Sequence, residues 1–108
     1  VIGIDEAQFY DESLVETVQE LANRGHYIIL AGLSQTSEGK PFGIMPQLLT
    51  IADNITSVYG VCMVCGEPAT KPFALRAKTE AVSIGAGDKY EARCRKCWLE
   101  GRRQRGEA

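Results

Sequence analysis

The residues with the clearest chemical potential are four cysteines in two pairs of equal spacing, Cys62-Met63-Val64-Cys65 and Cys94-Arg95-Lys96-Cys97, with 28 residues between the pairs. A C-x2-C turn points two thiolates toward one centre, so two such turns can surround a metal ion tetrahedrally. Four soft thiolates suit Zn²⁺. Two disulfides or reduced core thiols are the alternatives, but disulfides would be expected with an export leader, and none is visible. The spacing therefore predicts a structural zinc site made by all four cysteines.

A second candidate site is the acidic pair Asp5-Glu6, which directly follows the apolar run Val1-Ile2-Gly3-Ile4. A buried parallel strand would hold this pair at its carboxyl end, the edge at which α/β sheets bind ligands. There an aspartate can orient hydrated Mg²⁺ on ATP phosphates, and a glutamate can take a proton from an attacking hydroxyl group. Acidic residues also end many strands without such a role, so this Walker B-type pattern alone leaves both interpretations open.

The elements that must position the acidic pair are read from hydrophobic periodicity. Apolar residues recur at helical spacing over 14–22, Ser13 and Glu16 have the spacing of a capping box, and Gly25 stands where the helix should end. Residues 27–33 form a second apolar run. Strand, helix and strand of these lengths predict a βαβ unit with two parallel strands.

The pattern changes in the second half of the chain. Residues 34–43 are rich in Ser, Gly and Pro and predict a loop, Pro46 is placed to start a helix, and residues 57–61 predict a third strand. Beyond this point the periodicity fades and the cysteines begin. We therefore expect an α/β domain over residues 1–61 and a small metal-binding lobe over residues 62–108.

Composition excludes several classes of protein. The 108 residues include 12 Lys plus Arg, 14 Asp plus Glu, 44% hydrophobic and 24% charged residues, which fits a globular chain and not a disordered or collagen-like one. No apolar run approaches the roughly 20 residues of a membrane span. Residues 89–108 carry 7 basic and 3 acidic side chains, against 5 and 11 in residues 1–88. We interpret Arg102, Arg103 and Arg105 as a solvated, frayed terminus, and the acidic body argues against a nucleic-acid partner.

Taken in order, these segments resemble the type II thymidine kinase family. VIGIDEAQFY, KPFG, a C-x2-C pair and IGAGDKYEARCRKC follow one another as in that family, from Val1 to about Trp98. The resemblance implies an α/β fold, with a partial parallel sheet of the P-loop kinase type followed by a zinc-ribbon-like lobe that bears a lasso loop and a basic tail. It also implies ATP-dependent phosphorylation of the 5′-hydroxyl group of thymidine or deoxyuridine, for DNA synthesis, by a cytoplasmic homotetramer without membrane attachment.

The resemblance further implies roles for individual residues. Glu6 would be the general base, and Asp5 would act through the water shell of Mg²⁺. The ATP phosphates would lie beside Asp5, Glu6, Ala7 and Gln8. The residues expected to contact the nucleoside, with 81–85 as a lid, are Phe9, Leu33, Ser37, Phe42, Ala81, Val82, Ser83, Ile84, Gly85 and Tyr90. By spacing alone, core positions are the better explanation for Phe9, Leu33 and Phe42, and turns are the better explanation for the glycines.

Three positions depart from the family pattern. Ser34 stands where an Asp is common, Ser37 where a Phe packs on the base, and Pro72 where a Thr is frequent. Loss of a ring removes stacking worth about 0.5–1.5 kcal/mol beyond its buried area. We therefore expect an altered base pocket, and the sequence does not decide between thymidine and another deoxynucleoside.

The phosphate-binding loop G-x-x-x-x-G-K-[ST] does not occur in these 108 residues. We therefore expect the chain to be the C-terminal part of such a kinase, inactive until a P-loop segment supplies the site for ATP and Mg²⁺. The alternative is a non-catalytic zinc-ribbon module, derived from the same family, that serves binding or assembly.

Overall fold

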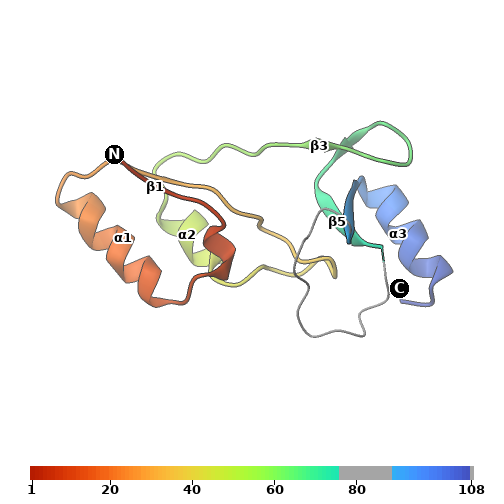
Figure 1. Cartoon of the computed structure of the whole chain (residues 1–108), viewed down its shortest axis with the longest axis horizontal. Coiled ribbons are helices and arrows are strands. Elements are labelled where there is room, and N and C mark those ends of the chain that lie inside the picture. The colour runs from red at the N-terminus through yellow and green to blue at the C-terminus, as the bar shows by residue number, and fades with distance from the viewer. Residues whose placement is uncertain (76–88, 108) are drawn as a thin grey trace. The chain divides into compact units, whose positions relative to one another are not determined.

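The computed structural model describes residues 1–75 and 89–107, and the chain divides into two compact units. The first unit consists of Val1–Thr36 and Lys40–Thr56, and the second of Ser37–Gly39 and Ser57–Ala108. Figure 1 labels the main helices and strands of both units. The expected lid, residues 81–85, lies outside the described residues.

A two-stranded parallel sheet forms the centre of the first unit. Strand β1 (Ile2–Ile4) pairs in parallel with β2 (Ile28–Leu30), and the helix between them provides the crossover. A hydrogen bond of 2.8 Å from the Ile2 N–H group to the Tyr27 carbonyl extends the pairing by one residue. The predicted parallel strands are confirmed, although both are shorter than the apolar runs that indicated them.

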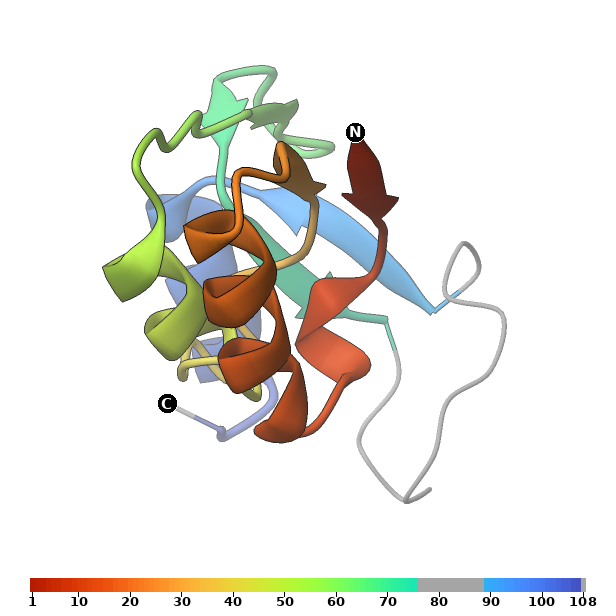
Figure 2. The same ribbon diagram turned by 90° about the vertical axis from the view of Figure 1, so that its left-hand side faces the viewer.

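Two helices and this sheet together form an apolar core. Helix α1 (Ser13–Asn23) and helix α2 (Met45–Ile51) lie side by side, as Figure 2 shows. Pro46 stands in the first turn of α2, as predicted from its fixed φ angle and missing N–H group. The buried members of the core are Ala7, Val18, Ile44, Met45 and Leu48.

The start of α1 differs from the predicted capping box of Ser13 and Glu16. Ser13 is the first helical residue, and the Asp11 carboxylate accepts hydrogen bonds from both its backbone N–H group (3.0 Å) and its hydroxyl group. A charged acceptor two residues upstream satisfies the helix end better than a neutral hydroxyl group. The Ser13 hydroxyl group, followed by the backbone N–H group, lowers the pKa of Asp11 from its ordinary value of 3.8.

The third strand, predicted over residues 57–61, is present only in part. Strand β3 covers only Gly60–Val61 and pairs antiparallel with β4 (Pro68–Ala69) in the second unit, not with the parallel sheet. The first cysteine pair makes the turn between them, because the Cys62 N–H group donates to the Glu67 carbonyl at 2.8 Å. A short hairpin closes at a lower entropic cost than a distant strand pairing, and periodicity alone does not register that competition.

The rest of the second unit is a hairpin with one helix packed on it. Strand β5 (Lys71–Ala74) pairs antiparallel with β6 (Tyr90–Arg93), and helix α3 (Arg95–Gln104) follows. The aromatic side chains Phe73 and Trp98 are buried in this unit. Within residues 1–75 and 89–107, no helix is long and apolar enough to cross a membrane.

The basic C-terminal end is folded, so the prediction of a frayed terminus is wrong. The Arg102 guanidinium lies 4.9 Å from the centre of the Trp98 ring, and that of Arg105 lies 4.3 Å from the centre of the Phe73 ring. Both arginines also pair with Glu107. Planar guanidinium groups stack on aromatic faces while keeping their edges hydrated, which explains how a cationic segment packs on this core.

Candidate functional site

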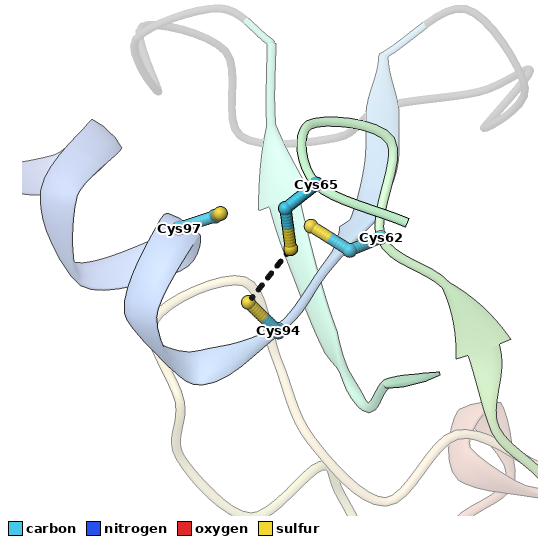
Figure 3. A group of neighbouring side chains, drawn as sticks. All are labelled: Cys62, Cys65, Cys94 and Cys97. Atoms are coloured by element: carbon cyan, nitrogen blue, oxygen red, sulfur yellow. Dashed lines mark hydrogen bonds between the residues drawn. The ribbon is translucent and has the colours of Figure 1, made fainter. Parts of the chain in front are cut away.

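Four cysteine side chains converge in the second unit. Their Sγ atoms all lie within 4.8 Å of one another, and Figure 3 shows the thiols pointing toward a common centre. The Sγ atoms of Cys65 and Cys94 are 3.7 Å apart. The structure therefore brings together the four residues that the spacing indicated, in an arrangement that could hold a zinc ion.

Two different turns present these thiols. In the first pair, the Gly66 N–H group donates to the Cys62 carbonyl (2.9 Å), and the Met63 N–H group ties the turn to the Ala92 carbonyl of β6 (3.0 Å). In the second pair, Cys94 is the residue before the first turn of α3, with an extended backbone (φ −71°, ψ 166°), and Cys97 lies within that turn. Each turn thus presents two thiols, and the bond to Ala92 links the first turn to the strand that leads into the second pair.

The electrostatics of the cluster suit a bound cation. Burial raises the pKa of Cys62, but hydrogen bonds from the backbone N–H groups of Cys94, Cys65 and Val64 outweigh it and bring that pKa down to about 6. Burial and then the neighbouring thiols raise the pKa of Cys97 to about 12. The Cys62 thiolate therefore forms readily, whereas burial and the neighbouring thiols oppose formation of the Cys97 thiolate. A divalent cation removes that opposition, so the donor set fits zinc.

The acidic pair follows β1 in the first unit. Glu6 has a left-handed backbone (φ 55°, ψ 41°), which is uncommon for a residue with a side chain, and its N–H group donates to the Asp5 carboxylate at 2.8 Å. The 3-10 helix η1 (Ala7–Phe9) begins directly afterwards. Both carboxylates are exposed, and strained backbone of this kind often occurs at functional sites.

Gln8 connects the acidic pair to the chain beyond β2. Its side chain is 3% exposed, its Oε1 accepts a hydrogen bond from the Leu33 N–H group (3.1 Å), and its Nε2 donates to the Glu6 carboxylate (3.4 Å). From the sequence, we expected Gln8 only to lie beside ATP, as one residue of the stretch from Asp5 to Gln8. Its buried amide and long-range partner leave no signal in a local pattern, so this connecting role was missed.

The expected nucleoside contacts fall into two groups. In the first unit, the Phe9 and Phe42 rings meet edge to face with their centres 5.5 Å apart. Phe9 is 67% and Leu33 55% exposed, which contradicts the alternative that these two residues are core. In the second unit, Ser37 is buried and Tyr90 is half-buried at the start of β6. Ala7, also expected beside ATP, is buried in the core, and its N–H group donates to the Ala31 carbonyl.

Lys71 is a further residue that sequence reasoning missed. Its side chain is buried in β5 with the ammonium group 4.5 Å from the centre of the Trp98 ring. Burial, followed by the nearby charge of Arg95, lowers its pKa. A lysine in a short apolar run carries no local sign that its partner is an aromatic ring 27 positions away.

Comparison with known proteins finds relatives of this chain. A family model described as thymidine kinase matches residues 1–98. A thymidine kinase from Rhodothermus sp. (strain ITI 518) is 46% identical over 98 residues, which are 91% of this chain and 46% of that protein. The chain thus spans about half the length of the curated relative that it matches.

Proposed function

The chain belongs to the thymidine kinase family, and from this premise we propose that it is the C-terminal portion of an enzyme that phosphorylates the 5′-hydroxyl group of thymidine or deoxyuridine with ATP. The observation that most supports this function is the position of Glu6. It offers an exposed carboxylate directly after a parallel strand, on strained backbone, with a buried amide beside it. Family membership favours this function over a non-catalytic zinc module.

In the proposed mechanism, Glu6 takes the proton of the 5′-hydroxyl group as that oxygen attacks the γ-phosphorus of ATP, the bond from this phosphorus to the β,γ-bridging oxygen breaks, and ADP leaves. The Gln8 amide orients the Glu6 carboxylate, and the Glu6 N–H group orients Asp5. Asp5 is proposed to hold Mg²⁺ through coordinated water, and that ion would neutralise charge on the phosphates. Phosphoryl transfer depends mostly on positioning and charge stabilisation, so these contacts contribute through geometry.

The residues proposed to contact the nucleoside are Phe9, Leu33, Phe42, Ser37 and Tyr90, together with residues 81–85 as a lid. Ser37 supplies no ring for the base. From the stacking energy of about 0.5–1.5 kcal/mol, we expect thymidine to bind roughly 2- to 12-fold more weakly than it would with a phenylalanine there.

The four cysteines, Cys62, Cys65, Cys94 and Cys97, are proposed to bind one structural zinc ion. Such an ion would stabilise a unit that is small for its own hydrophobic core, and it would take no part in the reaction. We also propose that turnover requires a phosphate-binding loop, which these 108 residues do not contain, and that the intact enzyme is a cytoplasmic homotetramer.

A chimeric enzyme tests this function. Residues 1–98 of this chain replace the matching portion of the Rhodothermus thymidine kinase, and thymidine-dependent formation of ADP is measured. We expect the chimera to turn over and the 108-residue chain alone to show no turnover. A folded, zinc-loaded chimera that forms no ADP above background in the presence of thymidine would refute the proposal.

A further inference from the structure

The loop after β2 folds into a narrow turn, and the residues at the end of this turn belong to the second unit. The Phe42 N–H group donates to the Ser34 carbonyl (3.0 Å) and the Thr36 N–H group to the Lys40 carbonyl (2.8 Å), so the two arms run antiparallel. We call Ser37–Gly39, at the end of these arms, the tip. It is assigned to the same unit as the cysteine cluster.

Trp98 makes the hydrogen bond that holds the tip. Its indole Nε1–H group donates to the Ser37 carbonyl (3.1 Å) and is shared with the Pro72 carbonyl of β5 (3.2 Å). The ring is 7% exposed, and the Lys71 ammonium group and the Arg102 guanidinium lie 4.5 Å and 4.9 Å from its centre. Cation–π contacts of this kind fix the plane of the ring, and thereby the direction of its single donor.

Gly39 fits this contact as no larger residue would. Its backbone has a φ angle of 78°, and an added Cβ atom would lie 3.0 Å from Cη2 and 3.3 Å from Cζ2 of Trp98. The tip thus rests directly on the edge of the indole ring. A Cβ atom here would strain the backbone and would require the tip or the ring to move by a few tenths of an ångström.

The position of the indole ring is tied to the cysteine cluster. Trp98 directly follows Cys97 in α3, and its backbone N–H group donates to the Cys94 carbonyl at 2.9 Å. The turn that presents two of the four thiols is therefore the turn that aims the indole ring. An interaction that orders this turn therefore also orders the indole ring that contacts the tip.

We propose that Trp98 is a positioning residue that couples metal binding at the four cysteines to the conformation of the Ser37–Gly39 tip. Metal binding fixes the first turn of α3, that turn fixes the indole ring, and the ring holds the Ser37 carbonyl. The consequence for nucleoside selection rests on the proposed function, in which Ser37 contacts the nucleoside. The coupling itself does not rest on that function, and it is measured by comparing the zinc-loaded with the metal-free chain, without nucleoside or ATP.

The first test uses Trp98 as the only tryptophan of the 108-residue chain. Gly39→Ala is compared with Gly106→Ala in the zinc-loaded protein. Gly106 has a similar φ angle of 71°, but nothing lies within 4 Å of an added Cβ atom there, so both variants carry backbone strain and only Gly39→Ala displaces the ring. We expect a shift of tryptophan emission to longer wavelength, with more quenching by acrylamide, in Gly39→Ala alone. Equal spectra for the two variants would overturn the proposal.

The second test uses Trp98→Phe, which keeps an aromatic ring for the cations and removes the N–H donor. Hydrogen exchange is followed at the Thr36 and Lys40 amides, which donate to the Lys40 carbonyl (2.8 Å) and the Thr36 hydroxyl group (3.2 Å) at the base of the tip. Zinc binding should slow this exchange about fivefold or more in the wild type, the value expected for gaining one hydrogen bond, and should have no such effect in Trp98→Phe. Exchange in β6 and the absorption spectrum of the Co²⁺-substituted cluster should be the same in both proteins. A purely structural role would accelerate β6 as much as the tip in Trp98→Phe, and that result, or an equal effect of zinc in both proteins, would contradict the coupling.

Discussion

Replacing Gln8 with methionine should destabilise the first unit by about 1–2 kcal/mol, because it leaves a backbone donor without its acceptor. The Gln8 side chain is 3% exposed and accepts a hydrogen bond from the Leu33 N–H group at 3.1 Å. Methionine has almost the same length and volume, so the cost of a cavity is small. An unsatisfied buried donor costs about 1–3 kcal/mol, and we take the lower part of that range because the hydrogen bond is only partly buried.

Thermal unfolding of the zinc-loaded chain, followed by circular dichroism, measures this cost. For a unit of this size, about 1–2 kcal/mol corresponds to a decrease in Tm of roughly 5–10 °C. The matched control is Gln19→Met, the same chemical change at an exposed position of α1, where glutamine and methionine have similar helix propensity. If Gln8→Met is no more destabilising than Gln19→Met, within about 0.5 kcal/mol, then the buried amide does not hold the chain beyond β2.

Three further predictions concern the core, the helix start and the metal. Leu48→Ala, at a position 3% exposed in the core of the first unit, should lower the free energy of unfolding by about 2–5 kcal/mol in denaturant titrations, and a loss below about 1 kcal/mol would mean that this core is not packed as described. The pKa of Asp11 is lowered in the folded state, so its contribution to stability is complete above the ordinary value of 3.8 and is lost as pH falls through the lower folded value. The difference in Tm between the wild type and Asp11→Ala should therefore shrink as pH falls below 3.8. A difference in Tm that does not depend on pH would disprove the cap. Atomic absorption should find about one zinc ion per chain. The ion should be lost in Cys97→Ser and on acidification, because thiolates and not thiols bind it. Full retention of zinc in Cys97→Ser would show that Cys97 is not a ligand.

The parts of the fold that sequence could predict are those fixed by local physics. The helical spacing over 14–22 and the proline at position 46 indicated α1 and α2, and the apolar runs indicated the parallel pair β1 and β2. The cysteine cluster was predictable because a C-x2-C spacing constrains its two thiols within a single turn.

The parts that could not be predicted depend on contacts between distant residues. Nothing near Lys71 in the sequence shows that β5 pairs with β6, and nothing near Arg105 shows that it lies over Phe73. The left-handed backbone of Glu6 is likewise invisible, because glutamate has no preference for that region. The frayed terminus was expected from its charge, and the packing of Arg102 and Arg105 on aromatic rings overrode that expectation. The third strand was expected over residues 57–61, and the hairpin with β4 limits it to Gly60–Val61.

The helix start illustrates the same limit within four residues. Both Asp11 and Ser13 are good capping residues, and the box spacing to Glu16 favoured Ser13. The structure uses the Asp11 carboxylate, which accepts from Ser13 twice. Competition between two caps is decided by acceptor strength and chain direction, neither of which the spacing records.

The claim on which the proposed function most depends is that Glu6 removes the proton in phosphoryl transfer, and the chimeric enzyme with Glu6→Gln tests it directly. Glu12→Gln serves as the control, since Glu12 is an exposed carboxylate at the start of α1 that makes no side-chain cap hydrogen bond. We expect Glu6→Gln to lower kcat by about 10²- to 10⁴-fold while KM for thymidine stays unchanged, as for a group that acts in the transition state. An unchanged kcat in Glu6→Gln, with Glu12→Gln also at the wild-type value, would contradict the assignment of Glu6 as the base.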